Sequence, residues 1–277
     1  MKNPNTFLIT GASQGLGLII VKQLLSAGKK VIATTRNADT FDPETKAHAN
    51  LEVISLDLTD ENSVASMVKD LRSRYSNIDV LINNAGFGFA GAIEEAQQDE
   101  VAKVIELNVL ATIRMTRLVL PLMREQKKGH IINLSSNAGL VSTAGFGIYN
   151  ASKYAVEGFS EALLLEVTGL GIQVTLIEPG AFRTNFLASS LALSRISIAD
   201  YDPTAGLFKT RLNANNGSQP GDPVKGAQAI IRVSEMENPP LRLLLGQDAY
   251  NRVTAKLKAV SLEIENLKQV TLSTDFN

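Results

Sequence analysis

The chain has 277 residues, of which 44% are hydrophobic and 20% charged, a balance typical of a globular protein rather than a disordered one. Its 27 basic and 28 acidic side chains give a formal charge of −1, which argues against nucleic acid or an anionic membrane surface as a partner. It contains no cysteine and only His48 and His130, so disulfides, cysteine nucleophiles and Cys-rich or multi-histidine metal sites are excluded, and we expect no metal.

Short, β-branched apolar runs alternate with longer helical periods along the chain. The expected strands are Thr6–Thr10, Val31–Thr35, Leu51–Leu56, Val80–Asn83, His130–Ser135, Gln173–Ile177 and Leu241–Leu245. The expected helices are Gly15–Ala27, Glu61–Tyr75, Asp99–Lys127, Tyr149–Thr168 and Val224–Met236. This order predicts an α/β fold with a doubly wound parallel sheet of about seven strands and helices on both faces. Pro121 should kink or break the long third helix.

Two segments depart from the alternation. Residues 181–222 form a connection far longer than normal and rich in large apolar side chains, which predicts a substrate lid; we call them the lid segment. Residues 247–268, the C-terminal extension, predict an amphipathic helix, which we expect to pack on its own domain rather than on a partner. Its apolar seam recurs at intervals of three and four residues: Tyr250, Val253, Leu257, Val260, Ile264 and Leu267.

The first residues show no targeting signal. Met1–Asn5 is polar, and the apolar run Phe7–Ile9 is too short for a secretory signal. No stretch approaches the roughly 18 apolar residues that a spanning helix needs. We therefore expect a cytoplasmic protein without a membrane partner.

A glycine-rich turn, Thr10–Gly17, follows the first strand and opens the first helix. Its glycines would let backbone N–H groups approach a phosphate, and the helix N-terminus adds positive potential. The turn also matches G-x-S-x-G around Ser13, a pattern typical of a hydrolase nucleophile elbow. Only one strand precedes Ser13, while His48 lies in a polar loop and His130 begins a buried strand. Phosphate binding is therefore favoured, and a hydrolase stays open as a minor alternative.

Tyr149 and Lys153 stand four residues apart on a predicted helix and share one face. A nearby ammonium lowers the pKa of a tyrosine, so Tyr149 could act as general acid or base toward a carbonyl or alcohol oxygen. Ser136 ends a strand 13 residues earlier and could bind the same oxygen. An isolated pair of this kind is more often an exposed contact, and its co-occurrence with the glycine-rich turn favours catalysis.

Together these motifs resemble the short-chain dehydrogenase/reductase family over about residues 5 to 250. The marks follow the family's order and spacing: Thr10–Gly17, Asp57, Asn83-Asn84-Ala85-Gly86, Asn108, Ser136, Tyr149-x-x-x-Lys153 and Pro179-Gly180. Residues 250–276 are similar to the tail of a bacterial oxidoreductase branch. The resemblance implies a single-domain Rossmann fold over residues 1–277. It also implies an oxidoreductase that transfers a hydride between a nicotinamide cofactor and a carbonyl or secondary alcohol.

The resemblance also implies roles for individual residues. Tyr149 would exchange the proton, Ser136 would steady the substrate oxygen, Lys153 would tune Tyr149 and hold the nicotinamide ribose, and Asn108 would support a water that reaches Lys153. The glycines would cradle the phosphates, and Asp57 would bind the adenine amino group. The implied cofactor contacts are Gly11, Ser13, Gln14, Gly15, Leu16, Gly17, Arg36, Asp57, Leu58, Asn83, Ala85, Gly86, Tyr149, Lys153, Pro179, Gly180 and Thr184.

The end of the second strand bears on the choice of nicotinamide cofactor. An acidic residue there binds the ribose 2′-hydroxyl of NAD, whereas an arginine suits the 2′-phosphate of NADP. Thr35 occupies this position and Arg36 follows it, which predicts NADP or NADPH rather than NAD. Gln14 stands where some NADP-dependent relatives carry a basic residue.

The loops expected over the carboxyl ends of the strands predict an apolar ketone or alcohol, because they are rich in Phe, Leu and Ile. They are Phe87–Phe89, Val141–Phe146 and the lid segment. The resemblance implies a homo-oligomer, a dimer or tetramer, formed through Asn108–Lys127 and Tyr149–Thr168. An alternative is a catalytically silent NADP-binding sensor that captures a partner through its C-terminal helix, but a pure sensor needs no Asn-Ser-Tyr-Lys set.

Overall fold

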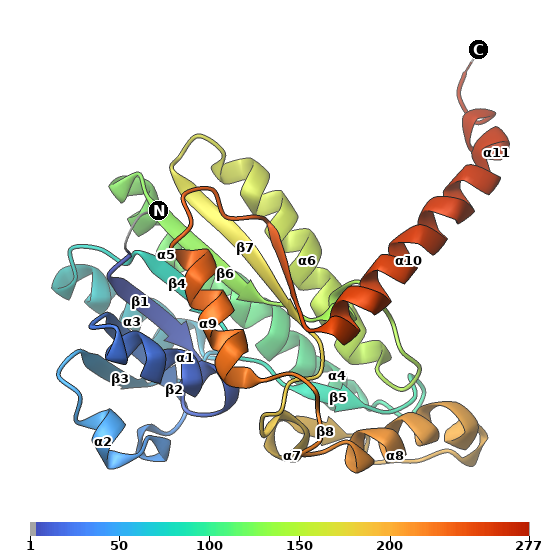
Figure 1. The fold of residues 1–277 in the computed structure, drawn as a ribbon, viewed down its shortest axis with the longest axis horizontal. Coiled ribbons are helices and arrows are strands. Elements are labelled where there is room, and N and C mark those ends of the chain that lie inside the picture. Colours follow the sequence, from blue (N-terminus) through green and yellow to red (C-terminus); the bar gives the residue numbers. More distant parts are fainter. Residues whose placement is uncertain (1–3, 277) are drawn as a thin grey trace.

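The computed structural model describes residues 4–276 and places a seven-stranded sheet at its centre (Figure 1). The strands are β1 (Thr6–Thr10), β2 (Lys30–Thr35), β3 (Leu51–Ser55), β4 (Val80–Asn83), β6 (Gly129–Leu134), β7 (Ile172–Pro179) and β9 (Arg242–Leu245). Their order is β3-β2-β1-β4-β6-β7-β9, and every neighbouring pair is parallel. The predicted doubly wound sheet is confirmed.

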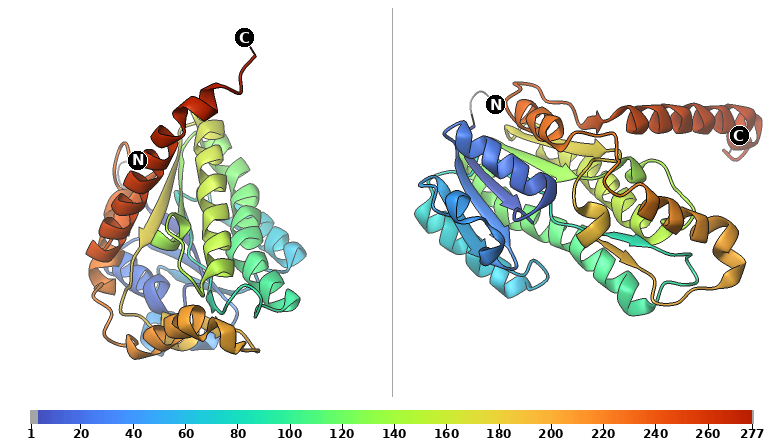
Figure 2. Two further views of the ribbon diagram at one scale, coloured as in Figure 1. Left: turned by 90° about the vertical axis from the view of Figure 1, so that its right-hand side faces the viewer. Right: turned by 60° about the horizontal axis from the view of Figure 1, so that its bottom comes forward.

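Helices cover both faces of this sheet (Figures 1 and 2). They are α1 (Gly15–Ser26), α2 (Pro43–Lys46), α3 (Glu61–Arg74), α4 (Gln98–Ile105), α5 (Ala111–Gln126), α6 (Gly147–Val167), α7 (Phe186–Ser189), α8 (Leu207–Ala214), α9 (Pro223–Ser234), α10 (Gln247–Asn266) and α11 (Lys268–Leu272). Because strand side chains alternate, Leu8 faces a core with α3, α5 and α6, whereas Phe7 and Ile9 face a second core with α1 and α9. Both cores exclude water and hold the sheet rigid beneath the loops.

The long helix predicted over Asp99–Lys127 is divided, but not at Pro121. A π-helical turn at Glu106–Leu110 separates α4 from α5, and α5 runs through Pro121 to Gln126. Asn108 is buried in this turn. Single π-helical turns inside helices are frequent at functional sites, and this one places a candidate site residue.

The lid segment is folded rather than an open loop. It contains α7, β8 (Leu191–Leu193) and α8, and β8 pairs in parallel with β5 (Gly88–Ala90) in a two-stranded sheet. Glu95, which is 2% exposed, anchors it. The carboxylate pairs with Lys209 Nζ at 2.8 Å and accepts a hydrogen bond from Ile198 N at 2.9 Å. The segment is thereby fixed to the chain after β5.

The C-terminal extension departs from the prediction that it packs on its own domain. Only Ala249 and Val253 of α10 are buried, and the helix points away from the sheet (Figure 2). It follows β9 at Gly246, whose φ of 100° turns the chain outward. Most of the apolar seam is therefore exposed. No helix among residues 4–276 is long and apolar enough to cross a membrane.

Candidate active site

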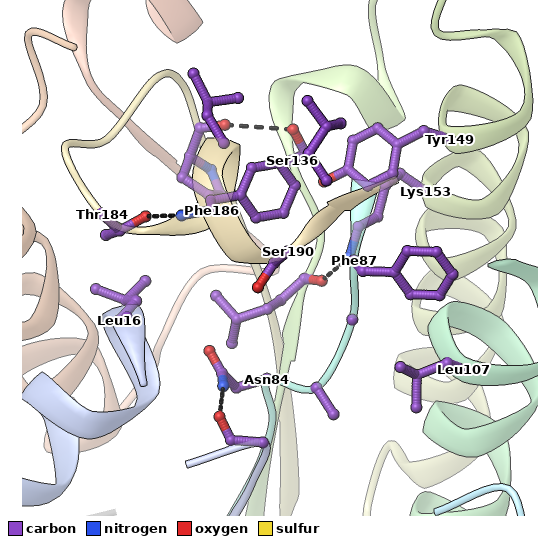
Figure 3. Close-up of a pocket in the computed structure, with 18 of the residues that line it drawn as sticks. Leu16, Asn84, Phe87, Leu107, Ser136, Tyr149, Lys153, Thr184, Phe186 and Ser190 are labelled. Carbon is purple, nitrogen blue, oxygen red and sulfur yellow. Dashed lines mark hydrogen bonds between the residues drawn. The ribbon is translucent and has the colours of Figure 1, made fainter. Parts of the chain in front are cut away.

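A cavity of about 1100 Å³ opens at the carboxyl ends of the strands, beside the point where the strand order reverses between β1 and β4. Doubly wound sheets bind ligands at this position. The glycine-rich turn, the ends of the central strands, the start of α6 and the lid segment line it. Figure 3 shows Leu16 and Asn84 in one part of the pocket and Ser136, Tyr149 and Phe186 in another.

The glycine-rich turn fits a phosphate. Gly11 and Gly15 have φ of 61° and 55°, in the left-handed region that favours glycine. A Cβ at Gly11 would lie 2.8 Å from Ala85 Cα, so the turn lies against the end of β4. No side chain caps the N-terminus of α1 at Gln14, which leaves its backbone N–H groups open to an anion. The predicted contacts Gly11, Ser13, Gln14, Gly15 and Leu16 all line the cavity.

Of the two consecutive asparagines after β4, the second one supports the site. Asn84 Nδ2 donates to the backbone oxygens of Thr10 and Gly11, both at 2.9 Å, and fixes the turn. Asn83, predicted to shape the cavity wall, points into the core instead, where it donates to Asn133 Oδ1 at 2.8 Å. It does not line the cavity, whereas Asn84, Ala85 and Gly86 do. Gly17 also lies behind the wall, and a Cβ there would approach Asn84 Nδ2 to 2.5 Å.

The ends of β2 and β3 form the polar end of the cavity. Thr35 Oγ1 donates to Ser13 Oγ at 2.9 Å, and the exposed Arg36 follows it. Asp57 Oδ1 accepts hydrogen bonds from the backbone and hydroxyl of Thr59, which, with the neighbouring Arg36, keep the pKa of the carboxyl below its usual range. The cavity lining includes these two charged residues and Leu58.

The lid segment closes over the glycine-rich turn. Gln14 Nε2 donates to Ser190 Oγ at 3.1 Å, and Gly88 N donates to the backbone oxygen of Ser190 at 2.7 Å. A Cβ at Gly15 would lie 3.9 Å from Thr184 Cβ. Gln14 therefore links the turn to the lid, a contact that the sequence did not reveal. Pro179, Gly180 and Thr184, which were predicted to contact the cofactor, all line the cavity.

Tyr149, Lys153 and Ser136 meet at the substrate side of the cavity. The first two lie on α6, one turn apart, with Lys153 Nζ 5.7 Å from the centre of the tyrosine ring. This ammonium donates to the backbone oxygen of Leu134 at 2.7 Å. Ser136 Oγ accepts a hydrogen bond from Ala138 N at 3.1 Å, and its contacts as a donor to Asn137 Oδ1 and Pro179 O are long, at 3.4 and 3.5 Å. The serine proton is therefore weakly bound to these two oxygens and can turn toward an acceptor in the cavity.

The protonation states of this pair are set by burial. Burial raises the pKa of Tyr149 to about 12, although a hydrogen bond with Ser136 acts in the opposite direction. Burial also lowers the pKa of Lys153 to about 8, against the attraction of Glu157. The lowered pKa of Tyr149 that was expected from Lys153 is not found in this structure, because the loss of water on burial outweighs the hydrogen bond with Ser136. Tyr149 is a neutral phenol at neutral pH, suited to donate a proton.

Asn108 acts behind the cavity wall. Its Oδ1 accepts from Phe87 N at 3.0 Å, and its Nδ2 donates to Phe87 O at 2.9 Å and to Ser152 Oγ at 3.0 Å. A Cβ at Gly86 would lie 3.1 Å from Asn108 Oδ1 and 3.7 Å from Lys153 Nζ, so both groups converge on this glycine. Asn108 thus holds the chain after β4 beside the lysine.

Aromatic rings enclose the space around Tyr149. Phe146 lies 4.5 Å from Tyr149 and 4.9 Å from Phe208 between ring centres, and Phe186 lies 6.2 Å from Tyr149. Phe186 and Phe208 come from the lid segment, which therefore contributes apolar rings beside Tyr149. The rings leave the tyrosine hydroxyl and Ser136 as polar groups in apolar surroundings.

Three residues that sequence reasoning missed also build this side. Asn150 Nδ2 donates to Ala138 O at 2.7 Å and holds the loop before α6. From the first turns of α10, Asp248 accepts from Ala181 N at 2.8 Å and Arg252 donates to Thr143 Oγ1 at 2.7 Å. Contacts between such distant segments leave no local pattern in the sequence. Only Asn150 had a signal, as an amide inside the Tyr149-x-x-x-Lys153 motif.

Comparison with known proteins agrees with this geometry. A sequence model for short chain dehydrogenases matches residues 5–192. The chain belongs to the short-chain dehydrogenase family. It is 35% identical over 270 residues to the oxidoreductase BOA17 of Botryotinia fuckeliana strain B05.10, covering 97% of this chain and 98% of that protein. It is 35% identical over 244 residues to a 3-ketodihydrosphingosine reductase of Bacteroides thetaiotaomicron, covering 88% of each.

A solved structure extends the likeness to nearly the whole chain. A short-chain dehydrogenase from Streptomyces avermitilis superposes with a TM-score of 0.93 at 40% identity, covering 99% of this chain and all of that one. This short-chain dehydrogenase is therefore an oxidoreductase that uses a nicotinamide cofactor. Family membership also removes the hydrolase alternative. Ser13 Oγ accepts from Thr35, while His130 is buried against Thr175 and His48 is exposed, so no histidine stands beside the serine.

Proposed function

We propose that this short-chain dehydrogenase reduces an apolar ketone with NADPH, or oxidises the matching secondary alcohol with NADP. The observation that carries the proposal is a neutral, buried Tyr149 beside Ser136 inside a ring of aromatic side chains. A polar pair in such surroundings recognises one oxygen atom on an otherwise apolar molecule.

In the reductive direction a nicotinamide, once bound, would supply the hydride for the carbonyl carbon, and this chain supplies the proton. Tyr149 donates its phenolic proton to the substrate oxygen, while Ser136 donates a hydrogen bond to the same oxygen. The phenolate that remains is stabilised by the Lys153 ammonium on the next turn of α6. Without that charge the phenolate would stand in a buried site, where it is unfavourable.

Lys153 returns a proton from solvent water to Tyr149, and Asn108 positions the chain beside the lysine. The lysine is held between Leu134 O and the chain after β4, which Asn108 fixes. We assign Lys153 to the nicotinamide ribose and to a proton path through a water supported by Asn108. The convergence of both side chains on Gly86 supports this assignment.

The preference for NADP rests on the end of β2. Thr35, Ser13 and Arg36 place two hydroxyl groups and one guanidinium there, and Thr35 stands where a carboxylate would bind the 2′-hydroxyl of NAD. A guanidinium matches the geometry of a phosphate, and because it is weakly hydrated it loses little when the phosphate displaces its water. Asp57 and Leu58 are assigned to the adenine ring.

The substrate class rests on the aromatic rings and on one relative. Phe146, Phe186 and Phe208 offer no charge to a substrate, and the relative from Bacteroides thetaiotaomicron is named for reducing a ketone. We also propose a homo-oligomer formed through α5 and α6. Leu165 on the outer face of α6 is 76% exposed, which supports contact with another copy.

Fluorescence titration of purified protein with NADPH and then with NADH tests the cofactor, and a panel of carbonyl compounds tests the substrate. We expect tighter binding of NADPH and turnover of apolar ketones ahead of small anionic ones. The chain has no tryptophan, so the protein background is low. Tighter NADH binding would contradict the role of Arg36, and preference for small anions would contradict the substrate class.

A further inference from the structure

The exposed seam of α10 has the pattern of a helix that pairs with another helix. Leu257, Ile264 and Leu267 are 57%, 64% and 60% exposed, and Val260 lies between them on the same face. Among the seam residues, Val253 near the base is buried and Val260 is half-buried. Spacings of alternately three and four residues average 3.5, which keeps an apolar seam facing one partner helix. A single amphipathic helix in water would leave this surface exposed.

The charges beside the seam indicate which partner fits. Its first half carries Arg252, Lys256 and Lys258, and its second half carries Glu263 and Glu265. Among the described residues, neither Lys256 nor Glu263 has an ion-pair partner within the chain. A second copy lying antiparallel would bring each basic half beside an acidic half. A parallel copy would bring like charges together, which is unfavourable.

We propose that α10 pairs in antiparallel orientation with α10 of a second copy of this chain. With the seam residues interdigitated, Leu257 packs on Val260 of the partner subunit. The same register sets Lys256 beside Glu263 of the partner subunit, on the flank of the seam. The two-fold symmetry of such a pair repeats this ion pair, so two of them border one apolar seam.

This contact goes beyond the proposed catalytic function and differs from the proposed contact through α5 and α6. It bears on the site, because the first turns of α10 carry Asp248 and Arg252, which bind Ala181 and Thr143 at the cavity wall. A partner helix would restrain the free length of α10 and hold these turns in place. Association thereby connects the oligomeric state to the substrate side of the cavity.

Disulfide trapping tests the orientation directly, since the chain has no native cysteine. In the double variant K256C/E263C the two positions lie about 10 Å apart along one helix, too far to join within a chain. We expect this variant to form a covalent dimer under mild oxidation at micromolar concentration. The single variant I264C serves as the control, because Ile264 and its copy would lie roughly 16 Å apart along the axis of the antiparallel pair, so only a parallel, in-register pair would join them. A dimer from I264C, or none from K256C/E263C, would overturn the proposal.

Charge exchange tests the register without a new bond. K256E and E263K each replace two attractive contacts by two repulsive ones. We therefore expect the dissociation constant of this interface, measured by sedimentation at low ionic strength, to rise roughly tenfold. The double variant K256E/E263K restores opposite charges and should recover the native mass. K258E makes the same charge change outside the flank and should have little effect. Equal masses for K256E, E263K and the unaltered chain would contradict the pairing.

Discussion

Burial strengthens the hold of Tyr149 on its proton, because it raises the pKa of the phenol from 10.0 to about 12. The side chain is 6% exposed, and the neighbouring Lys153 directs its ammonium to Leu134 O rather than to the phenol. The four-residue spacing correctly predicts that both side chains share a face of α6. It does not predict the direction of the tyrosine pKa shift, because spacing says nothing about how much water either group loses.

Replacing Tyr149 by phenylalanine removes the proposed proton donor and leaves the aromatic packing. We expect kcat for ketone reduction to fall by roughly 10²- to 10⁴-fold while the Kd for NADPH stays nearly unchanged. Steady-state kinetics and NADPH titration measure the two effects. Tyr154→Phe is the matched control, since Tyr154 lies on the same helix and is 40% exposed. Near-native turnover by the Tyr149 variant on a good substrate would show that another group donates the proton.

The pKa of Lys153 gives a pH dependence with a definite sign. Burial places this pKa near 8, below its usual value of 10.5, so the ammonium is lost as the pH rises through about 8. Glu157, four residues later on α6, opposes this loss. We expect kcat/KM for NADPH, which reports the free enzyme, to decline above about pH 8. Lys153→Arg should show no such decline, because a guanidinium does not titrate there; a flat native profile to pH 9.5 would contradict the assignment.

Several site residues could be predicted because their motifs are local. Most of the glycine-rich turn lines the cavity, and so do Ser136, the tyrosine and its lysine. Asn83 could not be distinguished from Asn84, because neighbouring residues at a strand end point to opposite sides, and either one can face the cavity. The roles of Phe208 and Arg252 depend on contacts across the fold, so no local pattern shows them.

Among the elements, the lid segment depends on one buried carboxylate. Burial alone would raise the pKa of Glu95, but hydrogen bonds from Lys209, Ile198 N and Ala92 N outweigh it and lower the pKa to about 2. Such a depressed pKa means that the stabilisation is present above the usual value of 4.5 and is lost as the pH falls from there toward 2. The lid segment is therefore fixed to the chain after β5 at neutral pH by a charged pair.

Glu95→Gln keeps the size of this anchor and removes its charge. We expect about 2 kcal/mol of destabilisation, concentrated in the lid segment, because Lys209 loses its counter-ion and is 18% exposed. Hydrogen exchange should accelerate over residues 186–214 and stay slow in the central sheet. Glu125→Gln, which breaks the exposed pair with Arg72, serves as the control and should cost well below 1 kcal/mol. Equal exchange in both variants would show that the lid is held by its apolar contacts.

The strands of the central sheet are predictable because buried parallel strands are continuous apolar runs, and each predicted strand overlaps an observed one. The short strands β5 and β8 could not be predicted, since three residues carry no usable period. The sequence predicts that the long helix divides at Pro121, but α5 continues through this residue. The π-helical turn around Asn108 depends on its bonds to Phe87 and Ser152, which lie far away in the sequence.

At the scale of the whole molecule, the periodicity of α10 predicts a helix with an apolar face but not what covers that face. The sequence pattern is the same for a helix against its own sheet and for one against a second copy. Burial distinguishes them, since only the first turns of α10 contact the domain. The hydrophobic core of the domain therefore ends near Val253, and the rest of α10 is exposed to solvent and buries little apolar surface.

This division predicts different effects for two truncations. Deleting residues 257–277 removes little buried apolar surface, so at low protein concentration we expect the Tm to change by less than about 2 °C. Deleting residues 247–277 also removes the buried Val253 and the bond from Ala181 N to Asp248, which should cost about 3 kcal/mol, or roughly 6–12 °C. Calorimetry on dilute samples measures both, and NADPH binding reports whether the shortened chains are native. An equal loss of Tm in both variants would mean that the outer helix stabilises the fold through contacts absent from the single chain, which remain populated even after dilution.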